Sequence, residues 1–290
     1  MIALAALIVE AAFGYPRRWW HPVMGVGVLI DRFEARWNRR RRLEGVARLV
    51  LLVALSVASG LAIERLGTVV TVLVATTGLA QRSLNDHVAA VALPLAAGDL
   101  PAARAAVAMI VGRDTDRLDE AGVATAAIES LAESFCDGVV APAIGLLLFG
   151  LPGLFAVKAI NTADSMVGHR TPELSAFGWA SAKADDLVNF VPARIAGALV
   201  AIAGRGGWRT MWRDAPGHAS PNGGWPEAAM AGALGRRLGG PVSYDGEAAA
   251  RAVLGEGPRP DARDLMAALR IYRTACLLLW LLVGGFAWVR

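Results

Sequence analysis

Long apolar stretches alternate with polar stretches along most of this chain. Residues 49–63 and 66–80 are apolar and are separated by only two charged residues. With their flanks they predict a transmembrane hairpin, because one helical span needs about 20 apolar residues. Residues 138–157 carry no charge, and residues 274–289 form the last apolar stretch. The pattern predicts four to six membrane segments.

Polar stretches fill the intervals between these segments. Residues 32–48 contain seven arginines and predict a basic cytoplasmic loop next to the membrane. Residues 81–137 are polar with helical periodicity, and the hairpin before them should return them to the cytoplasmic side. Residues 205–270 are polar and rich in Gly and Pro. The apolar residues 1–13 lack the basic start and cleavage site of a signal peptide, so we expect them to be retained.

The uncharged stretch 138–157 contains several helix-breaking residues, namely Pro142, Gly145, Gly150, Pro152 and Gly153. If this stretch crosses the membrane once, the polar sequence after it lies outside the cell; if it turns back, that sequence stays in the cytoplasm. Irregular backbone is tolerated at membrane depth where protein or a polar cavity covers it. We favour the re-entrant alternative. The predicted fold class is an all-α, multi-pass integral membrane protein with polar helical loops and a broken or re-entrant segment, built as one domain over residues 1–290.

Composition supports the membrane class and excludes several others. Hydrophobic residues make up 55% of the chain, and the mean hydropathy is +0.46. The two cysteines predict neither a disulfide framework nor a CxxC metal site. No aromatic platform or recognition-helix pattern accompanies the basic loop, so nucleic acid is not an expected partner. The Walker A, GxGxxG, HExxH and GxSxG motifs are all absent from the sequence.

Three carboxylates spaced four residues apart precede the uncharged stretch. Glu129, Glu133 and Asp137 should share one helical face, where like charges repel. Mg²⁺ is the natural counter-charge, since it prefers oxygen ligands and often binds together with a substrate phosphate. The alternative is a solvated acidic face.

The sequence KAINTADSMVGHRT, residues 158–171, follows the uncharged stretch and is dense in polar groups. Ionisable groups next to membrane segments are expensive to place there and are functional by default. Lys158 could hold a phosphate or carboxylate, and Asp164 a metal. His169 could act as an acid or base, or only form hydrogen bonds.

Two further segments carry candidate chemistry. Arg113 and Asp114 adjoin a glycine and suggest a phosphate or metal contact. Asp185 and Asp186 precede an apolar helix that contains Arg194, and an arginine within a membrane segment usually faces a cavity or a partner. The plainer explanation for Asp185 is a favourable interaction with the helix dipole.

Residues 214–246 form a long segment punctuated by Gly and Pro, which predicts an ordered loop. A helix should begin after Pro226 and cover residues 227–238. The candidate substrate-binding residues of this segment are His218, Asn222, Trp225 and Glu227.

Taken together, these motifs resemble the adenosylcobinamide-phosphate synthase family of cobalamin-biosynthesis membrane proteins. The resemblance rests on the runs HPVMGVGVLI, GRDT, AAIESLAESFCDGVVAP, KAINTADSMVGHRT, FGWASAKADDLVNFVPARI and DAPGHASPNGGWPEAAMAGALGRRLGGPVSYDG. It spans nearly the whole chain, in order and with natural spacing. The chain departs from the family's N-terminal pattern at Glu10 and Tyr15, and it has Ser134 and Ala184 at two further positions. The Tyr15 departure removes a carboxylate, which puts a role for that position in doubt.

The resemblance implies formation of an amide bond. A propionate carboxyl of adenosylcobyric acid would be joined to the amine of (R)-1-amino-2-propanol or of its O-phosphate, giving adenosylcobinamide or its phosphate. ATP and Mg²⁺ are the implied cofactors. The implied partners are the corrinoid, the amino-alcohol phosphate, the lipid bilayer and other cobalamin-assembly enzymes. The implied location is the inner membrane, with a cytoplasmic active site.

A site map follows from this chemistry, in which a carboxyl activated as an acyl phosphate reacts with an amine. The catalytic candidates are Lys158, Asp164, His169 and Glu133. Metal or substrate ammonium is assigned to Glu129, Glu133, Asp137 and Asp164. Phosphates are assigned to Lys158, Arg113, Arg170 and Arg194, and the base is His169 or His218. Further substrate contacts are Asp114, Asn161, Asp185, Asp186, Asn222, Trp225 and Glu227.

Two alternatives stay open at this point. The amine phosphate could be the only phosphate that binds, with activation occurring elsewhere, because no nucleotide motif is present. The chain could also be a non-catalytic corrinoid-binding or transport protein, although the lack of detectable inverted repeats argues against a transporter.

Overall fold

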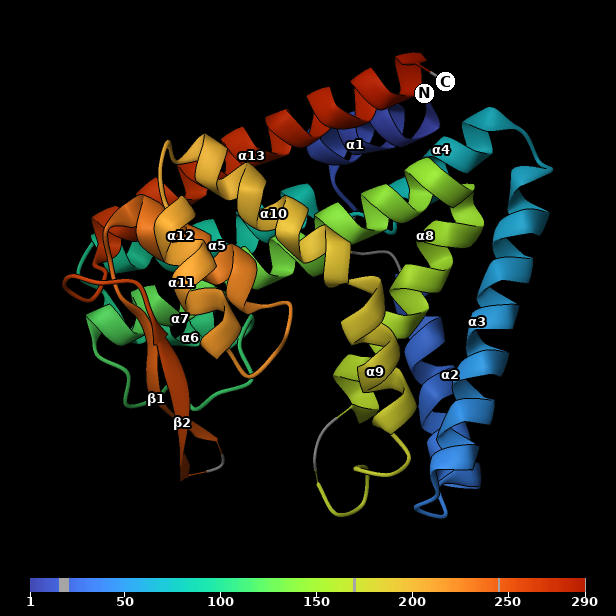
Figure 1. The fold of residues 1–290 in the computed structure, drawn as a ribbon, viewed down its shortest axis with the longest axis horizontal. Helices are drawn as coiled ribbons and strands as arrows, with labels where there is room; N and C mark the ends of the chain where they lie inside the picture. The colour runs from blue at the N-terminus through green and yellow to red at the C-terminus, as the bar shows by residue number, and fades with distance from the viewer. Residues whose placement is uncertain (16–20, 169–170, 245, 290) are drawn as a thin grey trace. The chain divides into compact units, whose positions relative to one another are not determined.

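The structure is a computed structural model, which describes residues 1–15, 21–168, 171–244 and 246–289 (Figure 1). The described residues are mostly helical and cluster into two compact units. Unit 1 comprises residues 1–80, 137–189 and 283–290, and unit 2 comprises residues 81–136 and 190–282. This division does not test the prediction of one domain over residues 1–290.

Unit 1 is a set of helices joined by short connections. Its central pair is α3 and α8, and α2 and α9 pack beside them (Figure 1). Buried residues from these helices form one apolar core that includes Ile30, Leu52, Ala163 and Phe177. The elements of unit 1 are α1 (Ile2–Phe13), α2 (Pro22–Trp37), α3 (Arg42–Glu64), α4 (Thr68–Thr76), the π-helical turn η1 (Cys136–Val140, from Asp137 on), α8 (Ala141–Val167) and α9 (Trp179–Val188).

The predicted break in the uncharged stretch is confirmed and lies at Gly150. This residue has φ 68° and ψ −157° inside α8, a conformation that is essentially restricted to glycine. A Cβ on Gly145 would lie 2.9 Å from the carbonyl oxygen of Gly153, although residues eight apart in a straight helix are about 12 Å apart along the axis. The chain therefore doubles back at Gly150. The side of the membrane on which it continues stays a prediction.

A side chain from α3 supports this reversal. The Glu64 carboxylate accepts a hydrogen bond from the backbone N–H of Leu151 at 2.8 Å. This N–H lies at the start of the second half of α8, where no carbonyl of a preceding helical turn is available. Glu64 thus acts as the N-cap of that half-helix, although it comes from another helix.

Three helices are long and apolar enough to cross a membrane, or four if the bent pair α9 and α10 counts as one span, among the residues described. The sequence predicted four to six membrane segments, and four are reached only if that bent pair is one span. The predicted hairpin is wrong in its second arm, because α4 has nine residues and is far too short to span. Gly67, with φ 103°, starts this helix and Gly78 follows it.

The predicted basic loop is also mostly helical. The first arginines of residues 32–48 lie on α2 and the last on α3, so that only residues 38–41 connect the helices. Arg48 is completely buried, with its guanidinium over the ring of Phe177 and hydrogen-bonded to Ser181. The sequence prediction failed here because it treated arginine as a marker of solvent. A guanidinium can instead be covered by an aromatic ring.

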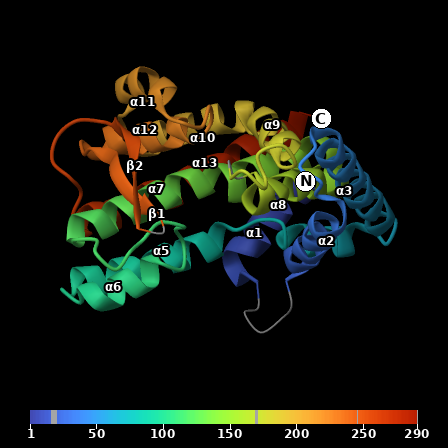
Figure 2. The ribbon, with the colours of Figure 1, turned by 90° about the horizontal axis from the view of Figure 1, so that it is seen from below.

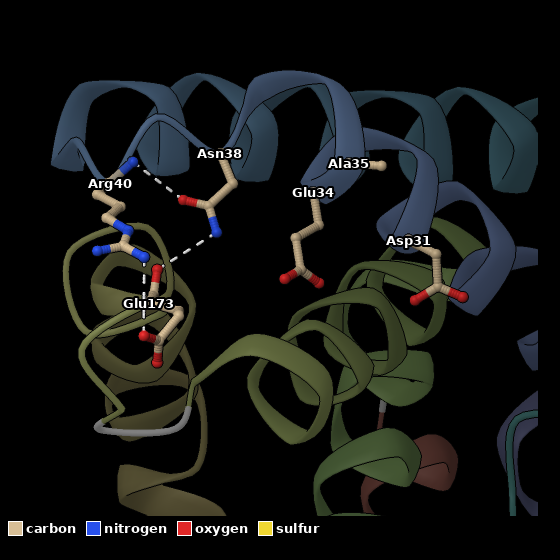
Figure 3. A pocket seen from close by; sticks show the side chains of 6 residues that line it. All are labelled: Asp31, Glu34, Ala35, Asn38, Arg40 and Glu173. Atoms are coloured by element: carbon tan, nitrogen blue, oxygen red, sulfur yellow. Dashed lines mark hydrogen bonds and ion pairs between the residues drawn. The ribbon is translucent and has the colours of Figure 1, made fainter.

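Unit 2 contains two groups of helices and a hairpin. Helices α5 (Gln81–Ala96), α6 (Leu100–Val107) and α7 (Glu120–Phe135) contact one another, as Figure 2 shows. A second group contains α10 (Phe190–Ala203), α11 (Trp208–Asp214), the short 3-10 turn η2 (Ala215–Gly217) and α12 (Gly224–Leu234). Most of α13 (Ala262–Val289) also belongs to this unit. The predicted helix 227–238 thus begins three residues earlier and ends at Gly235, which has the left-handed conformation of a helix end.

The hairpin is the one part of the described structure that departs from an all-α fold. Strands β1 (Leu238–Tyr244) and β2 (Glu247–Leu254) pair antiparallel, with Tyr244 opposite Glu247. The register shifts between Gly239 and Pro241, and both Gly239 and Gly240 have positive φ. The Gly-rich sequence that predicted a loop therefore builds a bulged hairpin.

Candidate functional site

Unit 2 holds a buried group of charged side chains that we call the ion cluster, namely Arg113, Glu129, His218, Glu227 and Arg251. Glu129 lies at its centre and is 1% exposed. Its carboxylate forms an ion pair with Arg113, accepts from Arg251 Nη1 at 3.1 Å and accepts from the backbone N–H of Gly239 at 2.6 Å. Glu129 therefore fastens the base of the hairpin to α7.

Glu227 lies on the opposite side of Arg251 from Glu129. Its Oε1 lies 3.5 Å from Arg251 Nη2 and 3.6 Å from His218 Nε2. Its Oε2 is buried without a hydrogen-bond partner among the described residues. Burial, together with the nearby carboxylates of Glu133 and Glu129, raises the pKa of Glu227 well above its ordinary value.

His218 is held as a neutral imidazole. Because a guanidinium can only donate, the 3.1 Å contact with Arg251 Nη2 assigns the accepting lone pair to His218 Nε2. Its Nδ1 accepts from the backbone N–H of Ser220 at 3.1 Å and lies 3.2 Å from the carbonyl oxygen of the same residue. Burial, and to a lesser degree Arg251, lowers the pKa of His218. A buried neutral histidine of this kind is suited to act as a base.

Glu133 lies beside the ion cluster, but its carboxylate does not pair with any member of the cluster. It is half-buried, and its side chain forms no hydrogen bond or ion pair with any described residue. A Cβ on Gly223 would lie 3.3 Å from Glu133 Oε1 and 3.1 Å from His218 Cε1. The lack of a side chain at Gly223 therefore lets the Glu133 carboxylate and the His218 ring both pack closely against this backbone position.

Arg194 forms a second cationic feature of unit 2. Its guanidinium lies over the rings of Phe190 and Trp225 and donates to Asn222 Oδ1 at 2.9 Å. Asn222 is buried, and Trp225 donates to the carbonyl of Pro221. The predicted substrate residues Arg194, Asn222 and Trp225 thus come together in space.

Asp114 lies at the other end of the hairpin. Its Oδ2 accepts from Ser243 Oγ at 2.5 Å and from the backbone N–H of Gly246 at 2.9 Å. In this structure Asp114 holds the hairpin tip. A phosphate or metal contact for Asp114 stays a prediction.

Unit 1 brings together two of the polar motifs seen in the sequence. Asp185 accepts hydrogen bonds from Asn161 Nδ2 at 2.8 Å and from Asn189 Nδ2 at 3.0 Å. Asn189 is buried, and its own Oδ1 has no hydrogen-bond partner among the described residues. The sequence motif at 158–171 and the Asp pair therefore share one polar network. Asp186, in contrast, is in an exposed ion pair with Lys183 at 2.8 Å.

Lys158 lies in the same unit, and its charge acts on two neighbours. It interacts electrostatically with Asp137, and burial together with the Lys158 charge lowers the pKa of His21. His21 itself caps α2 by accepting from the N–H of Val23 at 3.2 Å. Asp164 lies on α8, one turn before its end at Gly168.

Several predicted assignments are changed or left open by the structure. The metal set of Glu129, Glu133, Asp137 and Asp164 does not form a group of three metal-competent ligands in the described parts of the chain. Glu129 is engaged by two guanidinium groups, and the π-helical turn interrupts the four-residue spacing before Asp137. His169 and Arg170 lie outside the described residues, so their assignments stay predictions.

Arg251 is a site residue that the sequence analysis missed. It occurs in the unremarkable run AAARAVL on β2 and forms contacts with Glu129, Glu227 and His218. The only available signal was a single charge in an otherwise apolar, alternating stretch. Such a signal identifies a strand but not the partner of the charge.

Comparison with known proteins assigns the chain to a family. A sequence profile described as "CobD/Cbib protein" matches residues 3–272, so the chain belongs to the CobD/CbiB family. This confirms the resemblance seen in the sequence.

Individual relatives cover nearly the whole chain. A protein of Rhodobacter capsulatus named "Cobalamin biosynthesis protein CobD" is 47% identical, covering 97% of this chain and 95% of its own length. Proteins of the same name from Brucella anthropi and Geobacter metallireducens are 43% and 42% identical, over 94% and 97% of this chain and 92% and 94% of their own lengths. No similar solved structure was found.

Proposed function

We propose that this protein acts in cobalamin biosynthesis as an amide-forming ligase. It would join adenosylcobyric acid to (R)-1-amino-2-propanol O-phosphate, or to a related amino alcohol, to give adenosylcobinamide phosphate. The observation that carries this proposal is the near-complete coverage by relatives named for cobalamin biosynthesis. The ion cluster supports an enzymatic role, because a buried neutral histidine beside the unpaired carboxylate of Glu133 suits proton transfer from an amine.

The chain's own residues would supply the binding and proton-transfer steps. The substrate ammonium must lose a proton before its nitrogen can attack the activated carboxyl carbon. His218 is the base candidate that the structure supports, since burial and Arg251 lower the pKa of its imidazole. Arg194 and Lys158 are the cations proposed to hold phosphate groups.

ATP and Mg²⁺ are proposed as the source of carboxyl activation. The described residues do not offer a ready-made set of three metal ligands. Mg²⁺ is commonly held by one or two carboxylates together with substrate phosphates, so it would enter with the nucleotide. The proposed reaction therefore does not depend on a metal ion that the protein binds by itself.

The proposed location is the inner membrane, with several spans and a cytoplasmic active site. The three long apolar helices support a membrane protein. The proposed partners are the corrinoid, the amino-alcohol phosphate, the bilayer and other enzymes of cobalamin assembly.

Amide synthesis in isolated membranes tests the proposal. Wild-type protein should convert adenosylcobyric acid and the amino-alcohol phosphate to product only when ATP is present. Glu133→Gln, Asp164→Asn and Lys158→Ala should each lower turnover at least 10-fold, since each removes a charge from a proposed site. Glu120→Gln changes an exposed carboxylate on the same helix as Glu133 and serves as the control.

Each contrary outcome has a defined meaning. Turnover without ATP would remove ATP from this enzyme. Wild-type rates in all three variants would refute the site map. Corrinoid uptake that depends on this protein, without an amide product, would favour a non-catalytic corrinoid-binding or transport role.

A further inference from the structure

The ion cluster does not balance its own charge. With Glu133 beside it, three carboxylates, Glu129, Glu133 and Glu227, face two guanidinium groups, those of Arg113 and Arg251. Both guanidinium groups are directed to Glu129, and Arg251 reaches Glu227 only through Oε1. With all three carboxylates ionised the group would lack one positive charge on the side of Glu133 and Glu227, in line with the raised pKa of Glu227.

Two oxygen-bearing groups on that side have no partner among the described residues. Glu227 Oε2 is buried and accepts no hydrogen bond, although Glu227 is only 1% exposed. Glu133 forms neither a hydrogen bond nor an ion pair. A buried polar atom without a partner destabilises the fold, which suggests that a ligand satisfies it during function.

Gly223 relates these carboxylates to His218. This residue lies one helical turn before Glu227, whose N–H donates to the Gly223 carbonyl at 3.3 Å, so the two share a face of α12. A Cβ on Gly223 would approach His218 Cε1 at 3.1 Å and Glu133 Oε1 at 3.3 Å. Glu133 and the His218 ring thus meet at the start of the helix that carries Glu227.

We propose that Glu133 and Glu227, next to Gly223, form the subsite for a primary ammonium group. This inference rests on the proposed function and assigns the amine of the amino alcohol to this position. An ammonium group supplies the missing positive charge and donates three hydrogen bonds, which match Glu133, Glu227 Oε2 and one further acceptor. The His218 ring packs against the same Gly223, so the base would lie near the nitrogen that must lose a proton.

The geometry favours an organic ammonium over a metal ion. The described residues do not place three His, Cys, Asp or Glu side chains where they could hold a metal together. Calcium and magnesium require six or more oxygen ligands, whereas an ammonium needs only three acceptors. The cluster offers few free carboxylate oxygens because Glu129 is already engaged by the two arginines and Gly239.

Calorimetric binding to the detergent-solubilised full-length protein tests the inference without requiring turnover. The two probes are 1-amino-2-propanol O-phosphate and the matching propanediol phosphate, in which a hydroxyl replaces the amine. Wild-type protein should prefer the amine probe. Glu227→Gln and Glu133→Gln should each reduce this preference by about 10-fold or more, since a hydrogen bond to a charged group is lost.

Gly223→Ala and Glu120→Gln complete the design. The alanine keeps every charge and fits the ordinary φ of −55° at Gly223, but its methyl group would press against the His218 ring and the Glu133 carboxylate. By displacing these two side chains it should weaken binding of the amine probe while leaving the fold intact, as judged by an unchanged unfolding temperature. Glu120→Gln removes an exposed carboxylate from α7 and should bind both probes as the wild type does.

Unchanged amine preference in Glu227→Gln, Glu133→Gln and Gly223→Ala would overturn the subsite, whatever the protein catalyses. Binding of Mg²⁺ alone that is lost in the Gln variants, with no amine preference in the wild type, would overturn it in favour of a metal site. Failure of the proposed function has a different signature. In that case the amine preference and its loss in the variants persist, but no amide forms when the corrinoid and ATP are added.

Discussion

Replacing Gly150 by alanine should destabilise unit 1 by acting on the reversal of α8. Gly150 has φ 68° and ψ −157°, which a residue with a Cβ adopts only at considerable cost. The new methyl group would also overlap the Glu64 carboxylate, since its ideal position is 3.1 Å from Glu64 Cδ and closer still to Oε1. Glu64 would have to move, and the Leu151 N–H would lose its 2.8 Å hydrogen bond.

The expected loss follows from these two effects. The unfavourable backbone conformation costs about 1–3 kcal/mol. Loss of a hydrogen bond to a charged group adds about 1.5–3 kcal/mol. Together they amount to roughly 2.5–6 kcal/mol, which corresponds to an unfolding temperature lowered by about 5–24 °C if each kcal/mol shifts it by roughly 2–4 °C.

Thermal unfolding of the detergent-solubilised protein, followed by circular dichroism, measures the effect. Gly285→Ala is the matched control, because Gly285 is exposed on α13 and its added Cβ would meet nothing within 4 Å. Glu64→Gln keeps an acceptor for Leu151 but removes the charge, so it should lose less stability than Gly150→Ala. An unfolding temperature for Gly150→Ala within about 1 °C of the wild type would refute the argument.

Three further predictions concern the two units. The pKa of Glu227 is raised above its ordinary value of 4.5, so the folded chain keeps the carboxyl proton to a higher pH than the unfolded chain does. The stability that this group contributes therefore falls as pH rises above 4.5. Glu227→Gln should flatten the dependence of unfolding temperature on pH between 5 and 8, and an unaltered slope would contradict the assignment. Asp185→Asn replaces the charged acceptor of Asn161 and should cost about 1–3 kcal/mol in denaturant titrations, whereas a midpoint equal to that of wild type would count against this network. Gly45→Val should lower the unfolding temperature by several degrees, because even a Cβ would lie 2.9 Å from the Phe177 carbonyl carbon; unchanged melting would show that α3 shifts freely.

The sequence predicted the break in α8 correctly because its cause is local. Glycine and proline limit the backbone wherever they occur, so a cluster of them marks an interruption without knowledge of tertiary contacts. The same local reasoning placed a helix near residues 227–238, of which residues 227–234 are helical in the structure. The side of the membrane reached after Gly150 depends on all the spans together and cannot be read from this segment.

Errors arose where the environment of a residue depends on distant partners. Apolar residues 66–80 were assigned a span, but the glycines around α4 limit it to nine residues. Arg48 was placed in a solvated loop, because nothing near it in the sequence reveals that Phe177 and Ser181 cover it. The hairpin was missed because its glycines resemble those of a loop until strand pairing is known.

The carboxylates of α7 illustrate the same limit for the candidate site. Helical spacing correctly placed Glu129 and Glu133 on one face, one turn apart, and both were assigned to metal or substrate ammonium, with Glu133 also a catalytic candidate. The structure separates them, because Arg251 reaches Glu129 from a hairpin more than a hundred residues later in the chain and does not reach Glu133 closely enough to pair with it. One carboxylate is thereby committed to holding the hairpin, and the other stays available beside Glu227.

This division of roles has a consequence for Arg251 itself. Its guanidinium contacts Glu129, Glu227 and His218, so it fixes the accepting nitrogen of the histidine while it holds the hairpin to α7. Removing it would leave a buried carboxylate with less compensation, which costs more than the loss of a surface ion pair. The base and the ammonium subsite proposed above therefore both depend on a strand residue that need not touch the substrate. A family member that lacked the hairpin would need another cation at this position to keep the imidazole neutral.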